Sequence, residues 1–180
     1  MGKYDDCVFP MVNQGSSDLG TGELTIFSYD RLVDPHAPFR IEAMFYHTVD
    51  MASGYGTPFI DPWGVERGQW PHTHYADEMY ILMGTDHENP LDLGGVFELW
   101  IGEGEEAQCF VIDKATVFRI PAGTVHLPLR VRELRRPFIF IAMPLAPIMH
   151  DASVCEVLPP GLEKPSWVEG KRVVHASEYM

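Results

Sequence analysis

The sequence predicts an all-β, antiparallel fold, and three observations lead to that prediction. Fifteen prolines and sixteen glycines separate short apolar runs along the chain, a pattern typical of β-sandwiches and barrels. Within several runs the residues alternate with a period of two, as the side chains of a strand do. The connections between the runs are mostly too short for crossover helices, so neighbouring strands are expected to run antiparallel.

Nine strands are expected from these runs: Glu23–Ser28, Arg40–Val49, Gln69–His74, Glu78–Met83, Val96–Ile101, Gln108–Ile112, Thr116–Ile120, His126–Val131 and Phe138–Met143. In the second of them Ile41, Ala43, Phe45 and His47 share one face. The last strand is apolar on both faces, which is typical of the middle of a sandwich or of a barrel wall.

The 180 residues suit one domain, residues 1–180, with a barrel core at about residues 23–147. Residues 148–180 lose the alternation and contain Pro159, Pro160 and Pro165, so they are expected to form an arm over the barrel or over a partner subunit. The segment Asp50–Gly68 has no clear period. A loop of that length is either a lid over a site or a crossing loop packed by its own aromatic residues.

Composition excludes several classes of function. Thirteen Lys and Arg against 26 Asp and Glu give a net charge of −13, which repels phosphate backbones and argues against nucleic-acid binding. No apolar run has the length of a membrane-spanning helix, and the first residues contain no apolar signal core. The three cysteines are dispersed and odd in number, as reduced thiols are. We therefore expect a cytoplasmic protein without nucleic-acid or membrane partners.

The segment Pro71–Glu78 contains the strongest functional signal. His72 and His74, two residues apart on an extended strand, project from the same face, so both imidazoles can reach one ion. Glu78 has the same parity and adds a carboxylate oxygen if residues 75–77 form a short turn. Nitrogen and oxygen ligands without sulfur suit Fe(II), Mn(II), Ni(II), Co(II) or Zn(II).

A second segment downstream would complete the site. Pro121 and Gly123 form a turn between two strands, and His126 opens the strand that follows. Proline presets φ and glycine adopts conformations that other residues resist. Such a turn would direct His126 into the sheet interior, opposite the first three ligands.

Together the two segments resemble the motifs of the cupin superfamily, G(x)5HxH(x)3–4E(x)6G and G(x)5PxG(x)2H(x)3N. The resemblance covers residues 66–145 and implies a cupin (double-stranded β-helix, jelly-roll) barrel with N- and C-terminal arms. It also implies one divalent metal ion held by His72, His74, Glu78 and His126. The chain departs from the motifs in the spacing to Gly84, in Ala115 and in Arg130, which replace glycine and asparagine. These departures leave the four ligand positions intact.

Three further residues are candidates for catalytic roles. Arg130 lies four residues after His126 with the same parity, so on a continuing strand it would point into the cavity and bind a carboxylate or enolate. Tyr80 shares parity with Glu78 and would face the metal, either as a hydrogen-bond donor or as a packing residue. His47 would be a base in the cavity or a core residue.

Cupins perform many different reactions, so the resemblance leaves the function open. The leading hypothesis is a metal-dependent enzyme that acts on a small enol, β-dicarbonyl or hydroxy acid, with dioxygenase-type C–C or ring cleavage as the first choice. A redox-neutral isomerase or a C–C hydrolase or lyase is the second hypothesis. A cupin that binds a small ligand without catalysis is the third. A homodimer is expected, because the arm cannot bury much of its own surface.

Overall fold

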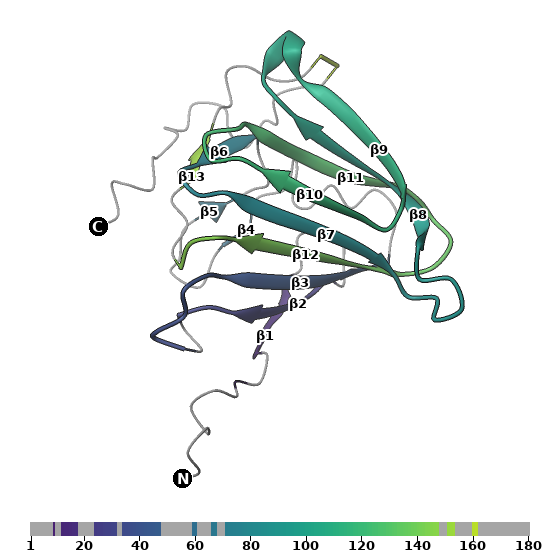
Figure 1. Cartoon of the computed structure of the whole chain (residues 1–180), viewed down its shortest axis with the longest axis horizontal. Helices are drawn as coiled ribbons and strands as arrows, with labels where there is room; N and C mark the ends of the chain where they lie inside the picture. The colour runs from purple at the N-terminus through teal and green to yellow at the C-terminus, as the bar shows by residue number, and fades with distance from the viewer. Residues whose placement is uncertain are drawn as a thin grey trace.

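The computed structural model describes residues 9, 12–17, 24–31, 34–47, 59–60, 66–67, 71–147, 151–153 and 160–161. These residues form two antiparallel sheets, with a separate pair of two-residue strands beside them (Figure 1). The first sheet has the order β1-β2-β3-β12-β7-β10, and its strands are Val12–Ser17, Leu24–Tyr29, Ile41–Tyr46, Phe138–Pro144, Glu78–Gly84 and Thr116–Ile120. The second has the order β13-β6-β11-β8-β9, with strands Asp151–Ser153, His72–His74, His126–Leu134, Asp92–Ile101 and Gln108–Lys114. The separate pair is β4 (Phe59–Ile60) and β5 (Glu66–Arg67).

The prediction of an all-β, antiparallel fold is confirmed. The described helical structure is the single 3-10 turn Gly104–Glu106. Among the residues that the structure describes, no helix has the length and apolar character that crossing a membrane requires. All nine predicted strands have a counterpart in the two sheets, although their ends differ by up to four residues. The largest difference is at β8, which begins at Asp92 instead of Val96.

The structure also contains strands that the sequence analysis did not predict. β1 pairs with β2 at the edge of the first sheet, and β13 comes from the segment predicted to be an arm. β13 pairs with β6 along all three of its residues, so part of this segment belongs to the second sheet. The predicted loop Asp50–Gly68 lies largely outside the described residues, apart from β4 and β5.

The core lies between the two sheets and is built by strict alternation. On β12 the side chains of Phe138, Phe140 and Ala142 are buried, while the residues between them are partly exposed. On β8, Phe97 and Leu99 point inward and are completely buried. Aromatic rings pack in contact through this core: the ring centroids of Tyr80 and Phe140 are 4.9 Å apart, and those of Phe140 and Phe97 are 5.8 Å apart.

A bulge near the start of β11 changes which side chains of that strand face the core. His126 pairs with Ile101 and Leu129 pairs with Leu99, so three steps along β11 match two steps along β8. The extra residue shifts the alternation by one position. Arg130 and Arg132, which follow the bulge with the parity of His126, therefore lie on the outer face of the sheet.

Gly84 closes β7 against the first residue of β8. A Cβ atom on Gly84 would lie 2.0 Å from the carbonyl oxygen of Asp92, a backbone atom that cannot rotate away. The position therefore requires glycine, because the two strands approach too closely for any side chain.

We predict that Gly84→Ala lowers the free energy of unfolding by about 3 kcal/mol, the upper range for overpacking, because one of two strand backbones must shift. Thermal or urea denaturation followed by circular dichroism measures the change. Leu91→Ala is the control, since Leu91 lies in the same connection and is 69% exposed. Equal stability of the Gly84→Ala variant and the wild type would contradict the close approach.

Candidate metal centre

The four predicted ligands come together from three strands in the two sheets. His72 and His74 lie on β6, His126 opens β11, and Glu78 opens β7 of the facing sheet. His126 pairs directly with His72 across the two neighbouring strands. Each of the three histidines offers a nitrogen within 4.8 Å of the others. The Oε2 atom of Glu78 lies 3.1 Å from Nε2 of His74 and 3.2 Å from Nε2 of His126.

Three of the four ligand side chains are buried away from solvent. His126 is completely buried, His74 and Glu78 are each 4% exposed, and His72 is half-buried. A buried carboxylate is unfavourable unless cations or hydrogen-bond donors compensate it. Burial alone would raise the pKa of Glu78, but interactions with His126 and then His74 lower that pKa to about 2. The carboxylate is therefore anionic at neutral pH.

Backbone carbonyls orient two of the imidazoles. Nδ1 of His74 lies 2.6 Å from the carbonyl oxygen of Ala76, and Nδ1 of His126 lies 2.9 Å from that of Thr124. A carbonyl oxygen only accepts hydrogen bonds, so Nδ1 carries the proton in both rings. The lone pair of each Nε2 atom is then directed at the centre of the site, which is the usual arrangement of metal-binding histidines.

This arrangement fits a bound cation. With Nδ1 protonated, the Nε2 lone pairs of His74 and His126 face a carboxylate oxygen that is also an acceptor. Such a contact is repulsive unless a proton on Nε2 or a metal cation lies between the atoms. The Nε2 atom of His126 is moreover buried without a hydrogen-bond partner, although it lies near Glu78. Two ligand atoms each 2.1 Å from one ion, at a right angle, are about 3.0 Å apart, close to the separations observed here.

Asp77 joins the two halves of the site, and the sequence analysis missed it. Its Oδ1 atom accepts a hydrogen bond from the backbone N–H of Ala122 at 2.9 Å. Its Oδ2 atom accepts from Nε of Arg119 at 2.9 Å. Beside this contact the N–H of Gly123 donates to the carbonyl oxygen of His74 at 2.8 Å. The turn before His126 is thereby held against the segment between His74 and Glu78.

Tyr80 lies beneath the ligands, as its parity with Glu78 predicts. The side chain is 4% exposed, and its ring centroid is 5.9 Å from that of His126 in an edge-on arrangement. On the other side the ring contacts Phe140. Tyr80 therefore forms the boundary between the ligand set and the aromatic core.

The structure does not bring Arg130 into the site, so the expectation that it points into the cavity is wrong. Its side chain is exposed on the outer face of the second sheet, opposite Glu98 of β8. The cause is the bulge between His126 and Leu129, which reverses the parity on which the expectation rested. A role in binding a substrate anion at this site is thereby removed.

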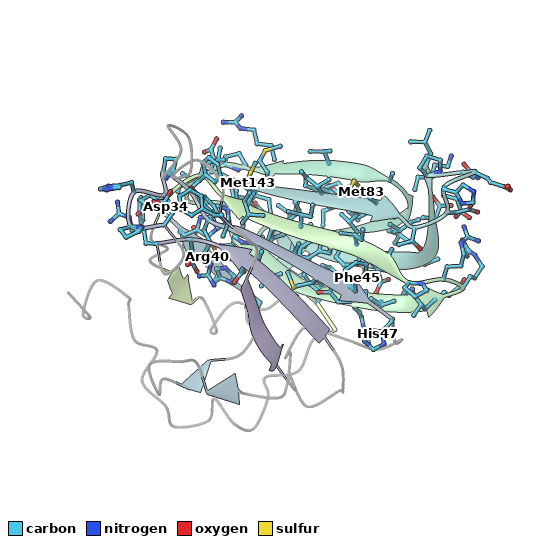
Figure 2. The ribbon with its side chains drawn as sticks, turned by 90° about the horizontal axis from the view of Figure 1, so that it is seen from below. Asp34, Arg40, Phe45, His47, Met83 and Met143 are labelled. Carbon is cyan, nitrogen blue, oxygen red and sulfur yellow. The ribbon has the colours of Figure 1, made fainter. Side chains whose placement is uncertain are left out.

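His47 is also far from the ligands, so the expectation of a base in the cavity is wrong. β3 pairs with β12 through Tyr46 and Phe138, and Phe138 pairs with Gly84 at the end of β7. Glu78 is at the other end of β7, six residues away, which is about 20 Å along a strand. His47 follows Tyr46 and lies beyond the far end of the sheet, as Figure 2 shows.

We predict that Asp77→Ala weakens metal binding about 10- to 100-fold although it removes no ligand, because the turn that positions His126 loses its attachment. Asp77→Asn should retain most of the affinity, since an amide oxygen still accepts from Ala122. Isothermal titration with the metal, or competition with a chelator, measures both variants.

Asp92→Ala is the matched control for Asp77→Ala. Asp92 accepts hydrogen bonds from the backbone of Gly94 and from Arg136, much as Asp77 does from Ala122 and Arg119. It lies at the start of β8, the end of that strand remote from His126. Metal affinity should therefore be unchanged in Asp92→Ala. Equal affinities in the two alanine variants would contradict the role of Asp77.

No protein-family model and no curated protein sequence matches the chain. Solved structures do. An oxalate oxidase in complex with the substrate analogue glycolate matches with a TM-score of 0.51 and 14% identity, over 97% of this chain and 77% of that one. Oxalate decarboxylase from Bacillus subtilis matches with a TM-score of 0.45 and 11% identity, over 82% of this chain. A vicilin from Solanum melongena matches with a TM-score of 0.46 and 13% identity, over 79% of this chain.

The chain spans about a third of the length of that decarboxylase and of that vicilin, with 30% and 33% of their residues covered. The match to the oxalate oxidase extends over nearly the whole chain. At 14% identity it shows a shared fold and nothing about function. Two facing antiparallel sheets, with the HxH pair and His126 on neighbouring strands of one sheet and Glu78 on the other, agree with it. The protein therefore has the cupin fold.

Proposed function

We propose that the protein is a mononuclear metal-dependent enzyme that acts on a small oxygenated organic molecule, by dioxygenase-type cleavage of a C–C bond or ring. The observation that carries the proposal is the convergence of the imidazoles of His72, His74 and His126 with the carboxylate of Glu78. Four protein ligands leave two positions free on a six-coordinate ion. An enol, a β-dicarbonyl or a hydroxy acid could bind there through one or two oxygens, and the last two classes have two oxygens at the right spacing to occupy both positions.

The ligand set narrows the choice of metal. Imidazole and carboxylate donors without a thiolate suit Fe(II), Mn(II), Ni(II), Co(II) or Zn(II). Such an ion supplies Lewis-acid polarisation of a substrate oxygen and, as Fe(II), activation of O2. The anionic Glu78 offsets part of the positive charge of the ion in a buried setting.

The protein's own groups prepare the site for this chemistry. The carbonyls of Ala76 and Thr124 keep the imidazoles of His74 and His126 in one orientation and one tautomer. The aromatic rings of Tyr80 and Phe140 close the barrel side of the site and exclude water there. The ring of Tyr80 lies edge-on to that of His126, and its hydroxyl is our candidate for a hydrogen bond to a substrate.

Within the described hydrophobic core beneath the ligands, acid–base groups are scarce, and this favours an oxidative reaction over an isomerisation. The core beneath the ligands consists of aliphatic and aromatic side chains, whose polar atoms are the hydroxyls of Tyr46 and Tyr80. A tyrosine has a pKa near 10 and is a weak base at neutral pH. Isomerisation, hydrolysis or lyase chemistry requires proton transfer, and the candidate base His47 lies away from the site. The redox-neutral mechanism is therefore the second proposal.

The oxalate oxidase that shares the fold was solved with glycolate, a two-carbon hydroxy acid. A ligand of that chemical class also suits two free metal positions next to a largely apolar wall. Binding of such a ligand without turnover is the third proposal. Measurements of O2 consumption and of substrate turnover separate the three.

We predict that His74→Ala or His126→Ala lowers the bound metal by at least about tenfold while the barrel remains folded, because the core is independent of the ion. Glu78→Gln should also weaken binding, since it removes the single anionic ligand. Elemental analysis of protein purified without a metal-chelating tag measures the content. His87→Ala, an exposed loop histidine, is the control and should bind as the wild type does. Equal metal content in the wild type and in all variants would show that the ion binds elsewhere.

We predict that the Fe(II)-loaded protein consumes O2 when one member of a panel of β-diketones, enols and hydroxy acids is supplied. An oxygen electrode, with product analysis by mass spectrometry, measures the ratio of O2 to substrate consumed. His126→Ala should abolish the consumption, because it removes a ligand. Turnover at an undiminished rate without O2 would instead establish the redox-neutral mechanism.

A further inference from the structure

An arginine lies on the inner face of the first sheet, at the end of the barrel where the metal ligands meet. Arg40 directly precedes β3, and its backbone N–H donates to the carbonyl oxygen of Pro144 at 3.3 Å. Pro144 is the register partner of Glu78 on β7. Arg40, Pro144 and Glu78 therefore form one row across three strands, and directly opposed residues present their side chains on the same face. Figure 2 shows Arg40 towards the end of the sheet marked by Met143, away from His47.

Glu42 lies in the adjacent row on the same inner face. It pairs with Ala142 on β12, and Ala142 pairs with Tyr80 on β7. Glu42 also has the parity of Tyr46, whose side chain is completely buried in the core. An ion pair joins the Arg40 guanidinium to the Glu42 carboxylate, as expected for residues two apart on a strand, which share a face. The two charged side chains therefore belong to the interior of the barrel and not to its outer surface.

The metal ligands approach from β6, β7 and β11, and the side formed by β12 and β3 contributes none of the four. In the rows of Glu78 and Tyr80, β12 contributes the short side chains of Pro144 and Ala142. The backbone of Arg40 is two strands away from that of Glu78, a separation of roughly 10 Å. A small molecule bound to the ion would span this distance along β12 to meet the guanidinium.

The guanidinium of Arg40 has donor capacity that the described residues leave unused. Its Nη2 atom donates to Glu42, whereas its Nε atom is buried and has no hydrogen-bond partner among the described residues. An arginine presents five N–H donors in a planar fork that matches a carboxylate. A buried N–H group without an acceptor is unfavourable, so this position indicates an acceptor that binds there. The side chain as a whole is 28% exposed, so a ligand from solvent can reach it.

The charges around Arg40 favour an anionic ligand on the side of the metal. Two carboxylates lie next to it: Glu42 on the same strand and Asp30, which follows β2, one strand further from the ligands. Neither lies on β12, between Arg40 and Glu78. A divalent ion with Glu78 as its single anionic ligand would add a net positive charge opposite the guanidinium. The chain as a whole has a net charge of −13, so these two cationic groups would attract an anion locally against that background.

We propose that Arg40 is the second anchor of the substrate: the metal ion binds oxygens at one end of the molecule, and the Arg40 guanidinium binds a carboxylate at the other. The substrate is then a small β-dicarbonyl or hydroxy acid with a carboxylate remote from the chelating oxygens. Glu42 orients the guanidinium towards it. The inference rests on the proposed function, because it requires a metal-bound substrate. It assigns to Arg40 the role that strand parity suggested for Arg130.

The test compares succinylacetone, a β-diketone with a carboxylate at the end of a short methylene chain, with its methyl ester. The two molecules share the chelating diketone and differ by one negative charge. Isothermal titration calorimetry on the Zn(II)-loaded full-length protein measures both affinities, and zinc has no redox chemistry that would consume them. The wild type should bind the acid about 10- to 100-fold more tightly than the ester, as expected for a hydrogen-bonded charge pair.

Substitution of Arg40 should change the affinity for the acid alone. Arg40→Met should remove the preference for the acid and leave the affinity for the ester unchanged. Arg40→Lys should retain a smaller preference, because an ammonium group keeps the charge without the planar fork. Arg130→Met is the matched control, since it removes the same charge from the outer face of the second sheet, and it should retain the full preference.

Elemental analysis and far-UV circular dichroism on each variant show that the zinc content and the fold are unchanged. Arg40→Gln serves in place of Arg40→Met if the methionine variant does not fold. Equal affinities of the wild type for acid and ester, or a preference that survives in the neutral Arg40 variant, would overturn the inference and leave the metal site intact. A wild type that binds no zinc, or that binds neither molecule when loaded with zinc, would overturn the proposed function together with the inference.

Discussion

The metal site depends on a small set of hydrogen bonds that join segments far apart in the sequence. Asp77 and Ala122 are separated by 45 residues, yet a carboxylate oxygen and a backbone N–H connect them at 2.9 Å. The bond from Gly123 to His74 lies beside it. Together they position the start of β11, and hence the side chain of His126, relative to the other ligands. Because the fold has already placed the ligands, an ion that binds there does not have to overcome the conformational entropy of gathering them.

The strands give this junction its rigidity. Glu78 is held because β7 pairs with β12 along its full length on one side and with β10 from Glu78 to Leu82 on the other. The aromatic core fills the space beneath, so Tyr80 and His126 have little freedom to move apart. A site built on strands and supported by packed rings keeps its geometry better than one built on loops.

The fold class and the residues of the candidate metal centre could be predicted from the sequence, because both depend on local patterns. Two histidines in alternation, followed by Glu78 and by a Pro/Gly turn before His126, specify residue types and spacings that hold within single segments. The position of Arg130 could not be predicted, since one extra residue in a bulge reverses the alternation. The role of Asp77 depends on a contact with a distant turn, which no local pattern records.

The prediction for His47 failed for a related reason. Alternation indicates the face on which a side chain lies but not the end of the barrel, which depends on the direction of β3 relative to β7. The same limit applies to β13, whose three residues have no distinctive pattern and form a strand only because β6 offers them an edge. The sequence shows that both sides of β12 are apolar. Which of its side chains face outward depends on the order of the strands in the sheet, and no single segment specifies that order.

The shortness of β6 has a consequence for the order in which parts of the protein open. This three-residue strand pairs with β11 at one position and with β13 at three. Few hydrogen bonds hold it, so without an ion its backbone amides should exchange with solvent at a lower opening free energy than those of β7 or β12. An ion bound to His72, His74, Glu78 and His126 connects β6 to two longer strands. Metal binding would then stabilise β6 against local opening. Proteolysis and amide exchange in this segment should therefore be slower in the metal-loaded protein.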